Sequence, residues 1–113
     1  MRDEDRNRLN HMLEAAEAAL RFVAGRKRGD LDTDQMLLFA LLRAVEVIGE
    51  AAANVSADGR AAGIPWPAIV GMRNRIIHAY FDVNTDVVWK TVTEEIPALV
   101  PKLKAVLGSR TTP

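Results

Sequence analysis

The chain has 113 residues, 49% of them hydrophobic, so it can bury one core but is too short for two ordinary domains. Its 15 basic side chains balance 15 acidic ones, which excludes a strong net field toward RNA or an acidic membrane and leaves such contacts to a local patch. Cysteine is absent, which excludes disulfides, thiolate zinc sites and cysteine nucleophiles, and the 2 histidines argue against a histidine-only metal site.

The first half of the chain has the apolar spacing of two amphipathic helices. Apolar residues recur every three or four positions over 9–23, and Gly25 offers a C-terminal stop for this helix. Asp32 followed by Gln35 resembles a capping box that begins a second helix. Its apolar stripe predicts a helix that ends near Val55.

The second half predicts two more helices. Turn and breaker residues over 63–67 precede a shorter helix that runs from Ala68 to about Tyr80. The apolar positions from Val88 to Val106 return to helical spacing, and an interior proline removes a backbone donor, so we expect a kink at Pro97 and Pro101. Side-chain oxygens that can cap this fourth helix belong to Asp82, Asn84 and Thr85.

No alternating strand pattern competes with these helices. The sequence therefore predicts an all-α fold, a single domain over 1–113 built as an up-and-down bundle of four main helices, with a short frayed tail from about residue 108. The charged start of the chain lacks a signal peptide, and no apolar run approaches the roughly 20 residues that span a bilayer. We expect a soluble, cytoplasmic protein with no membrane association.

The segment Gly71–Phe81 carries the richest chemistry, with two arginines, an amide, an imidazole and a phenol. Arginine offers a permanently charged, forked donor that matches phosphate oxygens. Histidine titrates near neutrality and can take and return a proton. Arg73 and His78 are therefore a candidate pair for phosphodiester cleavage without a metal.

The spacing of these residues does not by itself build a site. On an ideal helix of about 100° per residue, Asn74 and His78 share a face, whereas Arg73 and His78 lie roughly 140° apart. Arg73 can meet an imidazole through its long side chain, at a distorted helix end, or across a two-fold axis where a second copy supplies the missing group. This geometry favours a homodimer.

Arg73, Asn74, three further residues and then His78-Ala79-Tyr80 resemble the motif of HepT-like toxins in the HEPN superfamily. Other segments resemble that family in order and spacing, and they are Arg43–Ala52, Ile64–Trp66, Ile69–Met72 and Val87–Val92. The resemblance therefore covers most of the chain. An arginine and a histidine at this separation would alone be weak evidence, because such pairs occur by chance. The surrounding segments make the resemblance specific.

The resemblance implies a homodimeric ribonuclease that needs neither metal nor other cofactor. In such an enzyme the RNA 2′-hydroxyl attacks the adjacent phosphate and leaves a cyclic phosphate end. Carried onto this chain, His78 is the general base or acid, and Arg73 binds the scissile phosphate. Asn74 would orient the imidazole or the substrate, and Arg75 is a candidate auxiliary phosphate contact.

The resemblance also implies a protein partner. Toxins of this family are typically encoded beside an MNT-type nucleotidyltransferase antitoxin that attaches AMP to the motif tyrosine, which matches Tyr80 here. A bulky, anionic nucleotide beside a phosphate site would exclude RNA through steric overlap and like-charge repulsion.

Other notable residues have a plainer interpretation beside a functional one. Glu46 and Glu50 lie one turn apart and could form an acidic pair, but solvent exposure or pairing with arginine at a dimer interface is the favoured interpretation. Trp66 and Trp89 are expected in the core. The basic run 26–28 could guide RNA, although such runs usually lie in solvated loops.

A second function from another class remains open. The chain could be a non-catalytic helical interaction module that binds a nucleotidyltransferase partner or a nucleotide, with Arg73 and His78 serving recognition alone. Both functions predict the same fold. The position of His78 separates them, because an open basic groove favours cleavage and burial beside Trp66 or Trp89 favours a structural role.

Overall fold

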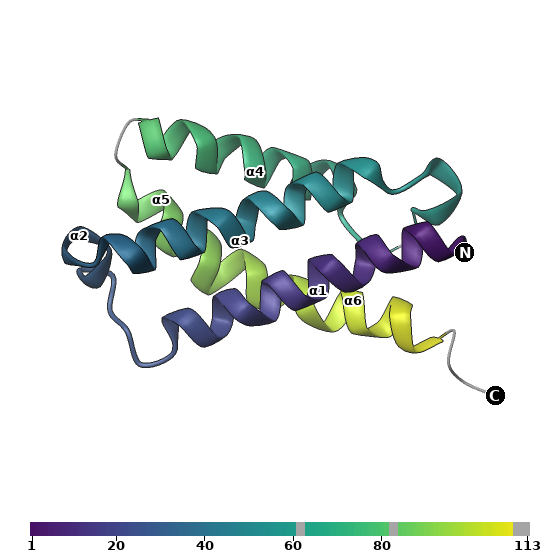
Figure 1. The fold of residues 1–113 in the computed structure, drawn as a ribbon, viewed down its shortest axis with the longest axis horizontal. Helices are drawn as coiled ribbons and strands as arrows, with labels where there is room; N and C mark the ends of the chain where they lie inside the picture. Colours follow the sequence, from purple (N-terminus) through teal and green to yellow (C-terminus); the bar gives the residue numbers. More distant parts are fainter. Residues whose placement is uncertain (61–62, 82–83, 110–113) are drawn as a thin grey trace.

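The computed structural model describes residues 1–60, 63–81 and 84–109 (Figure 1). Its elements in chain order are α1 (Asp3–Val23), α2 (Asp30–Thr33), α3 (Gln35–Asn54), the 3-10 turn η1 (Ala57–Gly59), α4 (Trp66–Phe81), α5 (Thr85–Lys90), the π-helical segment η2 (Thr91–Glu95) and α6 (Ile96–Ser109). The described residues contain no strand. The predicted all-α, up-and-down bundle is confirmed, because α1, α3, α4 and the α5–η2–α6 stretch alternate in direction.

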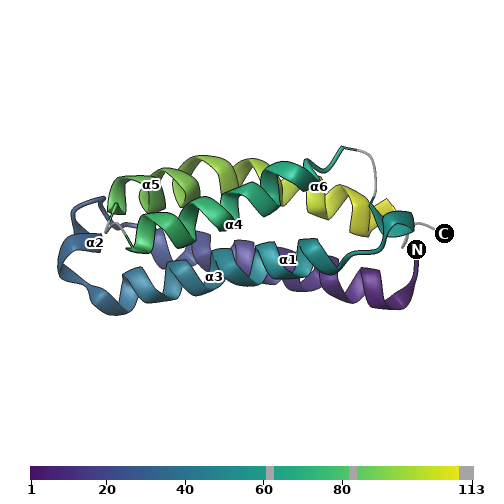
Figure 2. The same ribbon diagram turned by 90° about the horizontal axis from the view of Figure 1, so that it is seen from above.

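The bundle has two layers (Figure 2). Helices α1 and α3 lie side by side in one layer, and α4 and the α5–η2–α6 stretch form the other. Each helix turns its apolar stripe toward the space between the layers. The largest fully buried side chains are those of Leu9, Met12, Leu41, Ile48, Ile96, Leu103, Val45, Val88, Val92 and Thr91.

The connection between α1 and α3 differs from the sequence prediction in two respects, the residue that caps α3 and the presence of α2. Gly25 has a φ of 72°, as a helix stop requires. The cap of α3 is Asp34, whose side chain accepts a hydrogen bond from Leu37 N at 3.0 Å, so the predicted capping role of Asp32 is wrong. Asp32 lies instead in the short helix α2, which the apolar pattern did not indicate.

The fourth helical stretch contains a π-helical segment, in which Ile96 N donates to Thr91 O. Its buried residues Val88, Val92 and Ile96 are four positions apart. In a regular α-helix, four residues rotate by about 400°, so each of these side chains would lie about 40° further round the helix than the one before it and would move away from the core. A π-helical turn holds more residues than an α-helical turn, so it reduces this rotation and keeps the three side chains toward the core. The π-helical segment ends at Glu95, two residues before Pro97, which has no N–H to donate, whereas α6 begins at Ile96 and continues through Pro101. The expected irregularity therefore precedes Pro97.

The ends of the other predicted elements are close to the observed ones. Asn84 caps α5 by accepting from Val87 N at 3.3 Å, and Thr85 is the first residue of that helix. The alternative cap Asp82 and the tail residues 110–113 lie outside the described residues. Among the helices that are described, none is both long enough and apolar enough to cross a membrane.

Asp5 links α1 to the turn after α3. Its carboxylate is buried and accepts from Ser56 N at 2.9 Å and from Ser56 Oγ at 2.5 Å. These two hydrogen bonds lower the pKa of Asp5 below its ordinary value of 3.8. A side chain at Gly59 would overlap the carboxylate, so η1 can close over Asp5 only with glycine at that position.

The two chain ends described meet at one end of the bundle. Arg6 Nη2 donates to the carbonyl oxygen of Leu107 at 3.1 Å, which ties the start of α1 to the end of α6. Figure 1 shows that α2 and the C-terminal end of α4 lie at the opposite end. The bundle is elongated, with extents of 47 × 26 × 19 Å.

Replacing Asp5 with asparagine should lower the stability of the fold at neutral pH, because the amide loses the charge-assisted bonds from Ser56. The folded-state pKa is depressed, so the contribution of Asp5 is complete above the unfolded-state pKa and is lost as the pH falls through the folded-state pKa. Urea unfolding from about pH 7 to about pH 2 should show a gap between parent and variant that closes at the acid end. A difference in unfolding free energy that stays constant with pH would contradict this. Glu4→Gln is the control, because Glu4 is an exposed carboxylate of the same helix.

Candidate active site

Helix α4 carries the motif residues and has an unusual charge pattern. Pro67 lies in its first turn, where the missing N–H removes no intrahelical bond. Residues 66–81 include no aspartate or glutamate. The side chains of this helix that are cationic or can become so are Arg73, Arg75 and His78. The helix therefore presents positive charge without carboxylates of its own, which suits a polyanion.

Arg73 packs against the backbone of α3 beside Gly49. A Cβ on Gly49 would lie 2.7 Å from Cδ and 2.8 Å from Cγ of Arg73, and closer still to its Cβ. The Arg73 side chain is half-buried, and its Nε is buried with no hydrogen-bond partner among the described residues. Its Nη2 donates to Asn74 Oδ1 at 3.4 Å. Packing therefore holds Arg73, while its Nε has no acceptor within the part of the chain that the structure describes.

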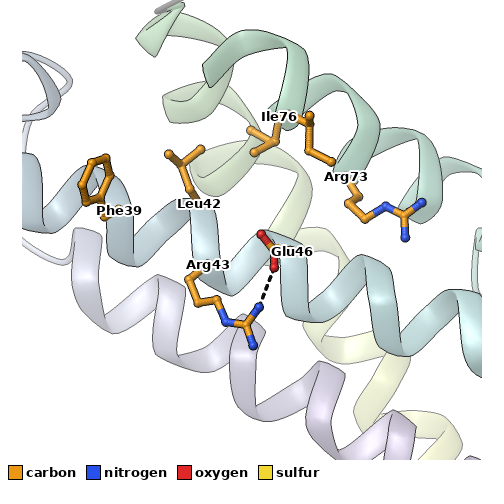
Figure 3. A pocket seen from close by; sticks show the side chains of 7 residues that line it. Phe39, Leu42, Arg43, Glu46, Arg73 and Ile76 are labelled. Carbon is orange, nitrogen blue, oxygen red and sulfur yellow. Dashed lines mark hydrogen bonds and ion pairs between the residues drawn. The ribbon is translucent and has the colours of Figure 1, made fainter. Parts of the chain in front are cut away.

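A groove of about 410 Å³ lies between α3 and α4, and Arg73 forms part of its wall (Figure 3). The residues that line it are Phe39, Leu42, Arg43 and Glu46 of α3 and Arg73, Ile76 and Ile77 of α4. Phe39 and Ile77 are 46% and 43% exposed, so the groove presents apolar surface to solvent beside the arginine. The apolar pattern alone did not find Phe39 and Ile77 as site residues, because each lies beside the buried stripe of its helix rather than in it.

Glu46 and Glu50 of α3 have different surroundings in the structure. Arg43 Nη1 donates to Glu46 Oε1 at 2.5 Å within the same helix, and Figure 3 shows this ion pair at the groove. Glu46 therefore pairs with an arginine of its own helix, and Glu50 is exposed. Among the side chains that the structure describes, no group of three or more His, Cys, Asp and Glu residues could hold a metal ion.

Asn74 and His78 are exposed and lie one turn apart on α4. His78 does not line the groove, so one chain brings Arg73 to Asn74 but does not bring the imidazole into the same cavity. His78 is also not a core residue, in contrast to Trp66, which is buried as predicted. Tyr80 belongs to the last turn of α4, and its side chain lies outside the described part of the structure.

Arg75 does not line the groove and contacts the fourth helical stretch instead. Its Nη2 donates to Glu95 Oε1 at 2.8 Å, and this ion pair is partly exposed. The role of Arg75 as an auxiliary phosphate contact stays a prediction, and RNA would have to compete with a carboxylate for this guanidinium.

The basic run 26–28 is largely neutralised by neighbouring carboxylates. Arg26 pairs with Asp30 and Asp34. Arg28 donates to Asp86, to Asp32 and to Thr85 Oγ1, and the bonds to the two carboxylates raise its pKa above the ordinary value. Arg28 thus joins α2 to the start of α5, a few residues after α4 ends. This favours a structural role for the run over guidance of RNA.

A family of known proteins matches this chain over most of its length. The family is described as Ribonuclease HepT-like, and its sequence model matches residues 12–106. The chain belongs to the HepT-like ribonuclease family. The matched range includes all of α3 and α4, and therefore the groove, Arg73 and the exposed His78.

This HepT-like ribonuclease is similar to individual proteins of several organisms. The chain is 38% identical over 101 residues to a candidate RNase of Caldanaerobacter subterraneus subsp. tengcongensis, a match that covers 88% of this chain and 90% of that protein. It is 38% identical over 106 residues to a candidate ribonuclease HepT of Thermococcus cleftensis, covering 92% and 96%. It is 32% identical over 100 residues to a candidate RNase of Methanocaldococcus jannaschii, covering 87% and 92%. No solved structure gives a significant match.

Proposed function

We propose that this ribonuclease is the toxin of a toxin–antitoxin pair, a metal-independent endoribonuclease that cleaves RNA as a homodimer and is inactivated by AMP transfer to Tyr80. The observation that carries the proposal is the state of Arg73, a half-buried cation on the wall of an open groove with Nε unpartnered among the described residues. Nη2 of this guanidinium lies at the exposed side chain of Asn74, and a phosphate oxygen there would accept a charge-assisted bond from it. RNA supplies such oxygens along its whole backbone.

The residues of α4 account for each step of cleavage. His78 takes the proton of the RNA 2′-hydroxyl, whose oxygen forms a bond to the adjacent phosphorus while the bond from phosphorus to the 5′ oxygen breaks. The leaving oxygen takes a proton back from the imidazolium, so the products carry a cyclic phosphate and a 5′-hydroxyl. Arg73 stabilises the charge that grows on the phosphate oxygens. Asn74 orients the imidazole or the substrate, and Arg75 contacts a flanking phosphate.

A homodimer would complete this site. Arg73 lines the groove and His78 does not, which supports a second copy as the source of the imidazole that meets each arginine. The exposed apolar side chains of Phe39 and Ile77 border the same groove, and a second copy would bury them. A two-fold axis along this face would bring His78 of one copy toward Arg73 of the other.

Tyr80 is the proposed point of control. It lies two residues after His78, in the last turn of α4. AMP attached there would place an anionic nucleotide beside the imidazole and the arginine, where it would occupy the space of the RNA backbone and repel it. An MNT-type nucleotidyltransferase is the antitoxin that would transfer the AMP.

His78→Ala and Arg73→Gln should each reduce RNA cleavage roughly 100-fold or more, because one removes the proton carrier and the other the charge that stabilises the transition state. The measurement is cleavage of cellular RNA in EDTA, with the products tested for cyclic phosphate ends. His11→Ala is the matched control, since this second histidine is exposed on α1, and it should cleave like the parent. If an AMP-free parent cleaves no RNA, the chain is instead the non-catalytic interaction module.

Mixing the two inactive variants should restore part of the activity. After denaturation and joint refolding, Arg73→Gln and His78→Ala chains form mixed dimers, in which one composite site has both groups intact. Cleavage by the mixture, compared with each variant refolded alone, checks this. No recovery in a mixture shown by mass spectrometry to contain mixed dimers would contradict a site shared between two copies.

Tyr80→Phe should keep RNA cleavage within a few-fold of the parent and lose inactivation by AMP transfer, because the ring stays while the acceptor hydroxyl is removed. The parent and the variant are incubated with ATP and an MNT-type nucleotidyltransferase, and intact mass is measured together with cleavage. The parent should gain AMP and stop cleaving, and Tyr80→Phe should do neither. Transfer of AMP to the variant with loss of cleavage would place the control point elsewhere.

A further inference from the structure

Gly49 is a glycine in the middle of α3 at a position where helix formation alone would favour another residue. Glycine is among the poorest helix formers because it loses the most backbone freedom. The structure supplies a reason for it. Any side chain at this position would enter the space that Cβ, Cγ and Cδ of Arg73 occupy, with separations of 2.7 Å to Cδ and 2.8 Å to Cγ.

The contact places the stem of Arg73 in a notch of α3. The three carbons that meet the notch are the first of the side chain, so they set the direction in which the guanidinium leaves the helix. Cβ of Arg73 is fixed to the backbone of α4 and cannot swing aside, so a methyl group at position 49 would have to push the two helices apart. The guanidinium beyond the notch keeps Nε buried and Nη2 within 3.4 Å of Asn74 Oδ1.

We propose that Gly49 is a positioning residue for the ribonuclease reaction, which holds the Arg73 guanidinium at the place where the scissile phosphate binds. This inference rests on the proposed function, because it assumes that Arg73 contacts that phosphate. Gly49 touches no substrate and acts through the arginine. A rigidly placed donor stabilises transition-state charge without having to reorganise during the reaction, and a shift of about 1 Å can cost roughly 100-fold in rate.

The chain offers a matched control in Gly71. This glycine lies on α4, two residues before Arg73, and a Cβ placed on it meets nothing within 4 Å. Gly49→Ala and Gly71→Ala are therefore the same chemical change in two packed helices, and only the first disturbs Arg73. Gly71→Ala should cleave RNA like the parent and unfold at an equal or higher temperature.

The first test compares the steady-state kinetics of these variants on a short RNA. Gly49→Ala should lose about 100-fold in kcat with little change in KM, because the arginine is misplaced while the rest of the RNA contact surface is kept. Equal kinetics for Gly49→Ala and Gly71→Ala would overturn the proposal.

A second readout does not need catalysis and separates this proposal from the proposed function. The Nε–Hε signal of Arg73 in a ¹H–¹⁵N spectrum, assigned by its loss in Arg73→Lys, should exchange slowly with solvent in the parent and in Gly71→Ala. In Gly49→Ala it should shift and exchange faster. An unchanged signal would overturn the positioning role whether or not the parent cleaves RNA. A changed signal with an inactive parent would overturn the proposed function and the catalytic consequence of Gly49, and would leave only the contact by which Gly49 holds Arg73.

If Gly49→Ala does not fold, a third set of variants tests whether the contact with Arg73 is the cause. The clash begins at Cβ of Arg73, so Arg73→Gly should restore folding of Gly49→Ala, while Arg73→Ala, which keeps that carbon, should not. Thermal unfolding of the double variants measures this. Equal instability with alanine and with glycine at position 73 would show that the contact is not the cause, and the proposal would be lost.

Discussion

The bundle depends on α3, which has to pack against α1 on one side and against α4 on the other. Two separate demands meet in its sequence. Leu41, Val45 and Ile48 are fully buried and supply the apolar area that holds the layers together. Gly49, the next residue, supplies no area at all, and its role is to let α4 come near. Stability and the placement of Arg73 are therefore set by adjacent residues of one helix.

The contact between Gly49 and Arg73 also explains how a guanidinium can be partly buried between α3 and α4. A guanidinium is costly to bury without acceptors, yet its aliphatic carbons gain from contact with apolar surface. The notch takes the carbons, and the groove leaves the outer part of the group near solvent. Of the Arg73 guanidinium, Nε is buried with no hydrogen-bond partner among the described residues, so the conflict between packing and solvation lies at this atom.

The four main helical stretches, their directions and the core could be predicted from the sequence because they follow from local spacing of apolar residues, as in the stripe that includes Ile48 of α3. The short helix α2 and the π-helical segment could not. The first has four residues and no stripe, and the second arises from a conflict between four-residue spacing and the α-helical turn before Pro97. In the site, chemistry identified Arg73 and His78 as candidates. The notch at Gly49 and the pairing of Arg75 with Glu95 depend on the distance between helices, which local spacing does not contain.

The meeting of the chain ends at Arg6 and Leu107 has a practical consequence for handling the molecule. Both ends of the described chain lie at the end of the bundle opposite to the last turn of α4, which carries Tyr80 (Figure 1). A tag, a fluorescent fusion or a link to a solid support at Met1 or after Ser109 would leave from that remote end. Protein attached to a sensor surface in this way would hold His78 outward, open to RNA or to an enzyme delivered in the flow.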